Sequence, residues 1–132
     1  LIVDEDAEIR HCAFVRGNAI VGKGAVVGNS TELKNVILFN KVQVPHYNYV
    51  GDSILGYKAH MGAGSITSNV KSDKTLVVVK DGDTLYETGL KKMGAIQSSL
   101  HLAENSLRVQ NIRLARLMRG WSPYKKRLPG MV

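Results

Sequence analysis

The sequence predicts an all-β fold, a parallel β-helix of triangular cross-section, because two columns of residues recur in it together. One column is aliphatic and recurs at every sixth residue, at Val3, Ile9, Val15, Val21, Val27 and Leu33. The second column consists of small residues four positions further on: Ala7, Ala13, Ala19, Ala25 and Thr31. After Leu33 the spacing slips by one residue, and the first column resumes at Leu38, Val44, Val50, Leu55, Met61 and Thr67.

A period of six differs from the spacing of three and four in an amphipathic helix and of two in a half-buried strand. Each hexad therefore forms one short side of a prism, with its aliphatic residue buried inside and its small residue at the crowded corner. Three hexads make one coil, and successive coils stack about 4.8 Å apart through main-chain hydrogen bonds. Six glycines are expected near corners that need a positive φ or a close approach: Gly22, Gly24, Gly28, Gly51, Gly56 and Gly62.

Residues 70–93 interrupt the period. Two segments, Thr75–Lys80 and Asp83–Thr88, flank a Lys-Asp-Gly turn, which predicts a β-hairpin that leaves the prism. Residues 92–96 then predict a return to the coil. We therefore expect a β-helix domain over residues 1–97, with the hairpin as an excursion from it.

Residues 98–132 are expected to form a separate basic tail. A helical spacing predicts a helix over residues 99–119, followed by an irregular segment. The apolar positions of this helix are Leu100, Ala103, Leu107, Leu114 and Leu117.

Most of the formal net charge of +7 also belongs to this tail. Seven of the 18 basic residues and one of the 11 acidic residues lie in residues 98–132, which leaves 11 basic and 10 acidic residues in the β-helix domain. A charge run of this kind is usually a solvated surface, so we do not expect nucleic-acid binding.

Other classes of protein are disfavoured by composition. A single cysteine, Cys12, excludes a disulfide framework within the chain and fits a reducing compartment. Apolar runs fall far short of the about 20 residues that a spanning helix needs, and no secretory leader is recognisable. Because the chain starts at Leu1, inside a repeat, we expect it to be a fragment of a longer protein.

Two motifs carry a resemblance to a known family. Residues 45–53 read PHYNYVGDS, and residues 62–69 read GAGSITSN. With them, residues 3–96 resemble the acetyltransferase domain of the bifunctional glucosamine-1-phosphate N-acetyltransferase / N-acetylglucosamine-1-phosphate uridylyltransferases. The resemblance implies left-handed coils, a homotrimer, a cytoplasmic location and a role in sugar-nucleotide biosynthesis. It also implies acetyl-CoA as the acetyl donor and an amino-sugar phosphate as the acceptor, with no metal in this domain.

The resemblance further implies a role for individual residues. His46 matches the general base that takes a proton from the amine of the sugar, a task that suits an imidazole with an ordinary pKa of about 6.5. Arg16 and Lys34 match the cations that bind the sugar phosphate. They are 18 residues apart, so they stack on adjacent coils, where they would repel each other unless an anion lay between them. Tyr49 matches a residue that contacts the sugar, and Asn69 one near the amine.

Three more positions complete the implied site. Ala63 and Lys74 match residues on the acetyl-CoA side, although Lys71 is placed as well as Lys74 for the second role. His60 stands among the substrate-binding positions where the family commonly has asparagine, which puts that hydrogen bond in doubt. In addition, the coils that form much of the acetyl-CoA groove in the family are replaced after Ile96 by the basic tail.

Alternative functions follow from these departures. The chain could be an inactive or truncated trimerisation scaffold of a sugar-phosphate nucleotidyltransferase. A zinc site between subunits is a second alternative, but no two of the four histidines, His11, His46, His60 and His101, have a ligand-like spacing. Nucleic-acid binding by the basic tail, with Trp121 and Tyr124, is a third.

Overall fold

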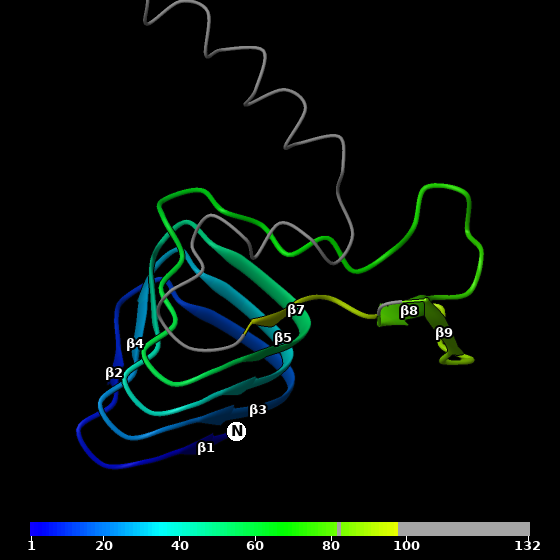
Figure 1. Cartoon of the computed structure of the whole chain (residues 1–132). Helices are drawn as coiled ribbons and strands as arrows, with labels where there is room; N and C mark the ends of the chain where they lie inside the picture. The colour runs from blue at the N-terminus through cyan, green and yellow to red at the C-terminus, as the bar shows by residue number, and fades with distance from the viewer. Residues whose placement is uncertain (82, 98–132) are drawn as a thin grey trace, which may run out of the picture.

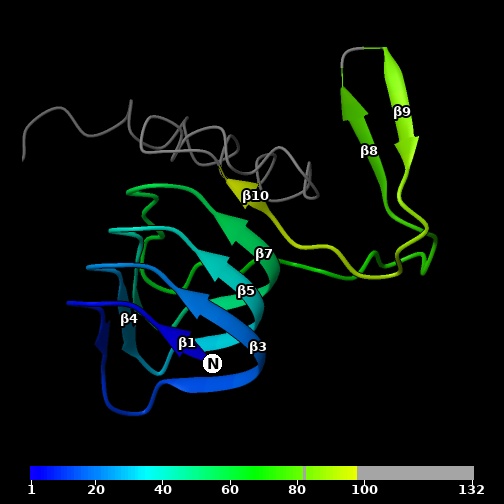
Figure 2. The same ribbon diagram turned by 90° about the horizontal axis from the view of Figure 1, so that it is seen from below.

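The computed structural model describes residues 1–81 and 83–97, in which the chain coils into a β-helix (Figure 1). No segment of these described residues is helical. The coils contain β1 (Ile2–Val3), β2 (Glu8–Ile9), β3 (Phe14–Val21), β4 (Val26–Asn29), β5 (Glu32–Leu38), β6 (Gln43–His46), β7 (Tyr49–Leu55) and β10 (Ile96–Gln97). Two further strands, β8 (Val78–Asp81) and β9 (Thr84–Glu87), form a hairpin that stands away from the coils (Figure 2).

Each strand of the prism pairs in parallel with the strand one coil further along the chain. One sheet has the order β1-β3-β5-β7-β10, and a second has the order β2-β4-β6. From β1 to β7 paired residues are 17 or 18 positions apart, as in Arg16 opposite Lys34 and Ala19 opposite Val36, whereas the hairpin separates β10 from β7 by more. The coils wind in the left-handed sense (Figures 1 and 2). The predicted hexapeptide-type β-helix is therefore confirmed.

The slip of one residue in the repeat has its origin at one corner. The strand β3 bends there, and its register with β5 shifts between Arg16 and Ala19. The first coil holds an extra residue at this point, Gly17, in the left-handed conformation with a φ of 69°. The offset between partners is therefore 18 before the corner and 17 after it, which shortens the next repeat.

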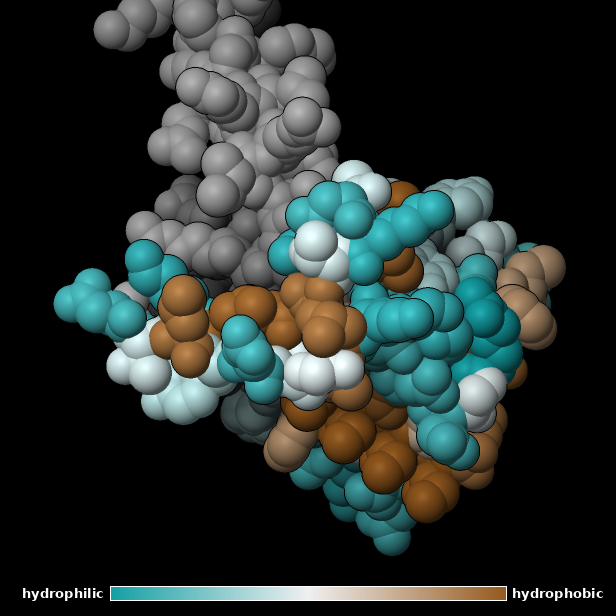
Figure 3. Space-filling view, turned by 90° about the vertical axis from the view of Figure 1, so that its right-hand side faces the viewer, coloured by the Kyte–Doolittle hydropathy of each residue, from teal (hydrophilic) through white to brown (hydrophobic). Residues whose placement is uncertain are grey.

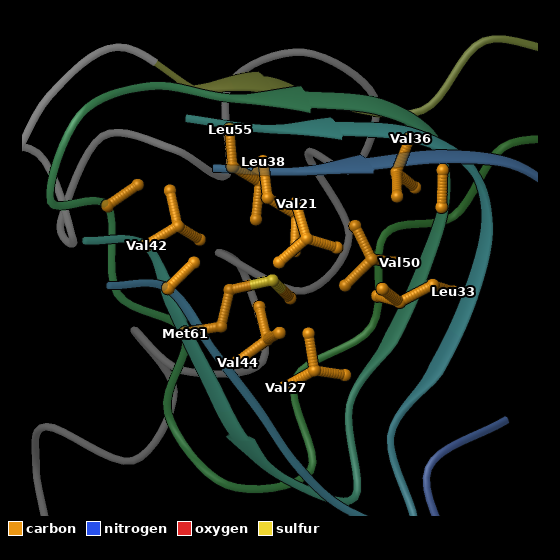
Figure 4. Close-up of a cluster of buried hydrophobic side chains, with 13 residues drawn as sticks. Val21, Val27, Leu33, Val36, Leu38, Val42, Val44, Val50, Leu55 and Met61 are labelled. Carbon is orange, nitrogen blue, oxygen red and sulfur yellow. The ribbon is translucent and has the colours of Figure 1, made fainter. Parts of the chain in front are cut away.

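The interior of the prism is filled by the two predicted columns (Figure 4). In the middle coils the aliphatic column is fully enclosed, at Val21, Val27, Leu33, Leu38, Val44, Val50 and Leu55. Two of the buried polar residues are Thr31, in the small column, and Asn48, which lies 17 residues further on, and both are satisfied. The Thr31 hydroxyl donates to the Val44 carbonyl at 3.0 Å, and the Asn48 amide donates to the Gly62 carbonyl at 2.7 Å.

The prediction of full burial is wrong for the first coil. Val3 and Ile9 are 42% and 40% exposed, and Val15 is only half-buried. These residues point inward like the rest of their column, but a coil covers them on one side only. A side chain inside a solenoid is fully buried only when a coil lies on each side of its own coil. The spacing of residues does not indicate which coils have two such neighbours.

Positive φ angles at the corners fall mostly on residues other than glycine. At one corner they fall on Cys12, Ser30 and Tyr47 in successive coils. Among the six glycines predicted for corners, only Gly24 has a positive φ. Gly28 serves the other predicted purpose, because a Cβ there would overlap the backbone carbonyl of Pro45 in the next coil.

Gly28→Ala is therefore expected to lower the free energy of unfolding by about 1–3 kcal/mol, since the overlap is with backbone that cannot rotate away. Gly62→Ala is the matched control two coils further on, where a Cβ would meet only the Ser65 hydroxyl at 3.8 Å. Urea unfolding followed by circular dichroism measures both. Equal stability of the two variants would contradict the close approach.

The predicted hairpin and the return to the coil are both present. The strands β8 and β9 pair in antiparallel fashion from Val78 opposite Glu87 to Asp81 opposite Thr84, so they are shorter than predicted. The excursion starts and ends at one corner, because the Met93 amide donates to the Asn69 carbonyl at 3.0 Å. Strand β10 then pairs with β7. The predicted helix at 99–119 and the rest of the tail lie outside the described residues.

Candidate functional site

Arg16 and Lys34 lie side by side on the surface of the prism. They are partners in the register of β3 and β5, as their spacing of 18 predicts. Their strands alternate between core and surface, so Val15 and Leu33 point inward while the two cations point outward. The fold therefore presents a pair of stacked cations in one column.

Each of these cations already has a carboxylate partner in the chain. The Arg16 Nε donates to a Glu32 oxygen at 2.6 Å, and the Lys34 Nζ donates to the two Asp52 oxygens at 3.1 and 3.2 Å. The four groups are electrically balanced, so the two cations can lie side by side without an external anion. Neither carboxylate was predicted, although Asp52 lies 18 residues after Lys34, the spacing that aligns neighbouring coils.

The Arg16–Glu32 pair leaves donors available. Glu32 engages only Nε of Arg16, and no other hydrogen bond to this guanidinium is present among the described residues. Side-chain exposures of 46% for Arg16 and 33% for Glu32 keep the pair in contact with water. The terminal amino groups of Arg16 can therefore bind an external anion while Nε stays anchored.

Asp52 lies at the corner next to this pair and gathers three donors. Besides Lys34, the Asn35 amide donates to it at 3.0 Å, and the Asn69 amide also donates to it. Burial alone would raise the pKa of Asp52, but the hydrogen bonds from Asn35, Lys34 and Asn69 outweigh it and leave the pKa below its ordinary value. Asp52 is therefore ionised at neutral pH.

Tyr49 joins the same cluster from strand β7. Its hydroxyl accepts a hydrogen bond from the Asn69 amide at 3.4 Å. The ring lies over Gly51, where a Cβ would come within 2.5 Å of the Tyr49 hydroxyl oxygen. The structure thus brings four predicted residues, Arg16, Lys34, Tyr49 and Asn69, into one region of the surface.

His46 lies at the end of strand β6, two corner residues before Tyr49. Its ring is exposed and makes no hydrogen bond or ion pair with the described residues, while its backbone N–H donates to the Asn48 side chain at 3.1 Å. The Gly64 amide donates to the His46 carbonyl at 3.0 Å, which places Ala63 beside His46 in the next coil. His46 and Ala63 are therefore neighbours in adjacent coils.

The other two predicted residues lie apart from this cluster. His60 is opposite Gln43, and the nitrogen Nδ1 of its ring is 3.3 Å from the Gln43 side-chain oxygen. Lys74 is exposed in the segment that leads to the hairpin, and among the described residues its only hydrogen bond runs from its backbone N–H to the Lys71 carbonyl. The Lys71 side chain is tied to Thr75 at 2.8 Å.

No three His, Cys, Asp or Glu side chains in the described part of the chain are close enough to hold a metal ion. No helix there has the length and hydropathy needed to cross a membrane.

Comparisons with known proteins agree with the resemblance. The family model of the GMPPB C-terminal domain matches residues 1–105. The bifunctional protein GlmU of Methanococcus maripaludis strain C5 is 38% identical over 84 residues, which cover 64% of this chain and 20% of that protein. The GlmU protein of Methanocaldococcus jannaschii is 34% identical over the same shares. That of a Picosynechococcus strain is 40% identical over 67 residues, or 51% of this chain and 15% of the relative.

The chain spans about a fifth of the length of the archaeal relatives and matches only that part of them. The family model, in contrast, extends over the whole β-helix and includes the hairpin. Repeat, register and sequence similarity thus point to the same group of proteins. The chain belongs to the GMPPB C-terminal domain family.

Proposed function

We propose that this chain forms the acceptor side of an acetyltransferase that moves an acetyl group from acetyl-CoA to the amine of glucosamine-1-phosphate or a related amino-sugar phosphate. The observation that supports it most directly is the in-register pair of Arg16 and Lys34. A phosphate monoester is an anion with several acceptor oxygens, and adjacent Arg and Lys donors suit it. The similarity to the bifunctional GlmU proteins supports a place in sugar-nucleotide biosynthesis, for which the cytoplasm is the implied location.

The proposed reaction needs a base near the amine. His46 takes a proton from the ammonium group, and the freed amine attacks the thioester carbonyl of acetyl-CoA. The new N–C bond forms as the C–S bond breaks. The nitrogen loses its second proton; of the two protons that it gives up, one is taken by the leaving thiolate of CoA, which departs as the thiol, and the other is released to water. Ala63 and Lys74 remain the proposed contacts with acetyl-CoA.

Arg16→Ala is expected to weaken glucosamine-1-phosphate binding by about 30- to 150-fold, which corresponds to about 2–3 kcal/mol of charge-assisted hydrogen bonding. Isothermal titration calorimetry measures it, with glucosamine lacking the phosphate as a second ligand. The control is Arg10→Ala, because Arg10 is also paired with a glutamate, Glu8, at 2.8 Å. The next coil carries Gly28 at the position equivalent to Lys34, so Arg10 has no cation above it.

The scaffold alternative has one observation in its favour. Glu32 and Asp52 already balance the charges of Arg16 and Lys34, so these cations have partners without an added anion. If the chain that carries Arg16 does not bind glucosamine-1-phosphate, the scaffold is favoured. Equal binding by Arg16→Ala and Arg10→Ala would also contradict the proposed phosphate site.

We also propose a homotrimer. The surface of the β1-β3-β5-β7-β10 sheet carries an unbroken stack of outward-facing isoleucines that are 36–63% exposed, at Ile2, Ile20, Ile37, Ile54 and Ile96. A row of apolar side chains beside a hydrophilic patch is visible in Figure 3. Identical stacks on three parallel prisms match in height and would bury one another. Light scattering should give the trimer mass, and a monodisperse monomer at high concentration would contradict it.

A further inference from the structure

Asp52 connects the two halves of the proposed acceptor site. It contacts Lys34, on the phosphate side, and Asn69, on the amine side. Both members of the ion pair are largely enclosed, with side-chain exposures of 18% for Lys34 and 16% for Asp52. The carboxylate is therefore an internal part of the cluster, unlike the more exposed Arg16–Glu32 pair.

The corner column also explains why an acid is needed at this position. In successive coils the column reads Asn35, Asp52, Asn69, and both amides donate to the carboxylate between them. An amide in the middle would donate to one neighbour and accept from the other. An ionised carboxylate accepts only, so it compels both neighbours to turn their NH2 groups toward it.

The orientation of Asn69 follows from this chemistry. Its Nδ2 faces Asp52 and also lies 3.4 Å from the Tyr49 hydroxyl. The carbonyl oxygen Oδ1 of the same amide is therefore turned away from Asp52. An oxygen in that position can accept a hydrogen bond from an amine or ammonium group, which an NH2 group cannot do.

We propose that Asp52 is a positioning residue, which holds the Lys34 ammonium in the column of Arg16 and orients the Asn69 amide so that its carbonyl oxygen receives an N–H of the amino sugar. The inference rests on the proposed function and deepens it. It makes the site selective for a ligand that carries both an anion and an amine. Asp52 acts through Lys34 and Asn69 and need not touch the substrate.

The first test needs no ligand. The side-chain amide signals of Asn69 in the nitrogen-15 NMR spectrum should shift as Asp52 becomes protonated in acid, below the ordinary pKa range of an aspartate, and Asp52→Asn should abolish the shift. The other titratable side chains around Asp52 are Lys34, Arg16 and Tyr49. Glu32 is the other carboxylate of the cluster, so Glu32→Gln is recorded as the control and should retain the shift. An Asn69 side-chain signal that does not shift when Asp52 is protonated overturns the proposal.

The second test exchanges the two side chains. Asp52→Asn should weaken glucosamine-1-phosphate binding about tenfold, because Asn69 can then flip its amide. In the double variant Asp52→Asn/Asn69→Asp, the carboxylate again faces an amide and presents an oxygen to the amine. Binding should return to within about threefold of the original affinity. Asparagine suits position 52, where φ is 48°, since Asn and Asp tolerate the left-handed region.

Asp6→Asn is the matched control for loss of one negative charge at a left-handed corner. Asp6 has a φ of 55°, and its side chain is 78% exposed, so it is not enclosed as the side chain of Asp52 is. It should bind like the unaltered chain. Unchanged affinity in Asp52→Asn, or a double variant no better than Asp52→Asn, overturns the proposal. If the unaltered chain does not bind glucosamine-1-phosphate, the proposed function is wrong. The proposed hydrogen bond from the amine of the sugar to the Asn69 carbonyl oxygen is then wrong too. The NMR titration still decides whether Asp52 orients Asn69.

Discussion

Val27→Asp is expected to unfold the chain. Val27 is fully buried in the prism, packed between Ile9 of the coil before it and Val44 of the coil after it. A carboxylate there would have no partner in an apolar column, and an uncompensated buried charge costs about 3–5 kcal/mol. That loss is comparable to the whole stability of a small domain, which starts at about 5 kcal/mol. Circular dichroism and urea unfolding measure the effect.

The neighbouring residue of the same strand provides the control. Val26 points to the other face of β4 and is partly exposed, so Val26→Asp adds the same charge without entering the core. We expect it to remain folded. A Val27→Asp protein that is soluble and unfolds cooperatively would contradict the arrangement of the core.

His46→Ala is expected to lower kcat for glucosamine-1-phosphate acetylation by about 10²–10⁴-fold with little change in KM. A general base acts mainly in the transition state, whereas a phosphate-binding cation contributes to binding the acceptor as well. The assay uses a chimera in which the coils of the Methanococcus maripaludis relative follow Ile96, because the resemblance places much of the acetyl-CoA groove there. Initial rates over a range of acceptor concentrations separate kcat from KM.

His11→Ala is the matched control. His11 is also exposed, at the same corner of the prism, and its ring contacts Asn29, the residue that pairs with His46 in the register of β4 and β6. Its replacement should leave both constants unchanged. A chimera that acetylates equally well with and without His46 would exclude it as the base, whatever holds the phosphate.

The candidate site was only partly predictable from the sequence. The spacing of 18 predicts that Arg16 and Lys34 are neighbours, and the structure places them opposite each other. Glu32 and Asp52 were not predicted, because a resemblance in substrate-binding positions does not indicate which side chains pair with those positions. The spacing of 18 between Lys34 and Asp52 was a signal that could have found one of them.

The repeat by itself determined the β-helix and the two columns that fill it, because a period of six leaves few other ways to bury one residue in six. The period does not predict how deeply Val15 is buried or which hydrogen bonds Asp52 accepts. Val15 is half-buried because only one side of its coil is covered, and that depends on where the stack of coils ends. Asp52 accepts hydrogen bonds from Lys34, Asn35 and Asn69 because the backbone at this corner is left-handed and turns the carboxylate toward both neighbouring coils. Such contacts depend on the direction of each side chain in space, which only the folded chain decides.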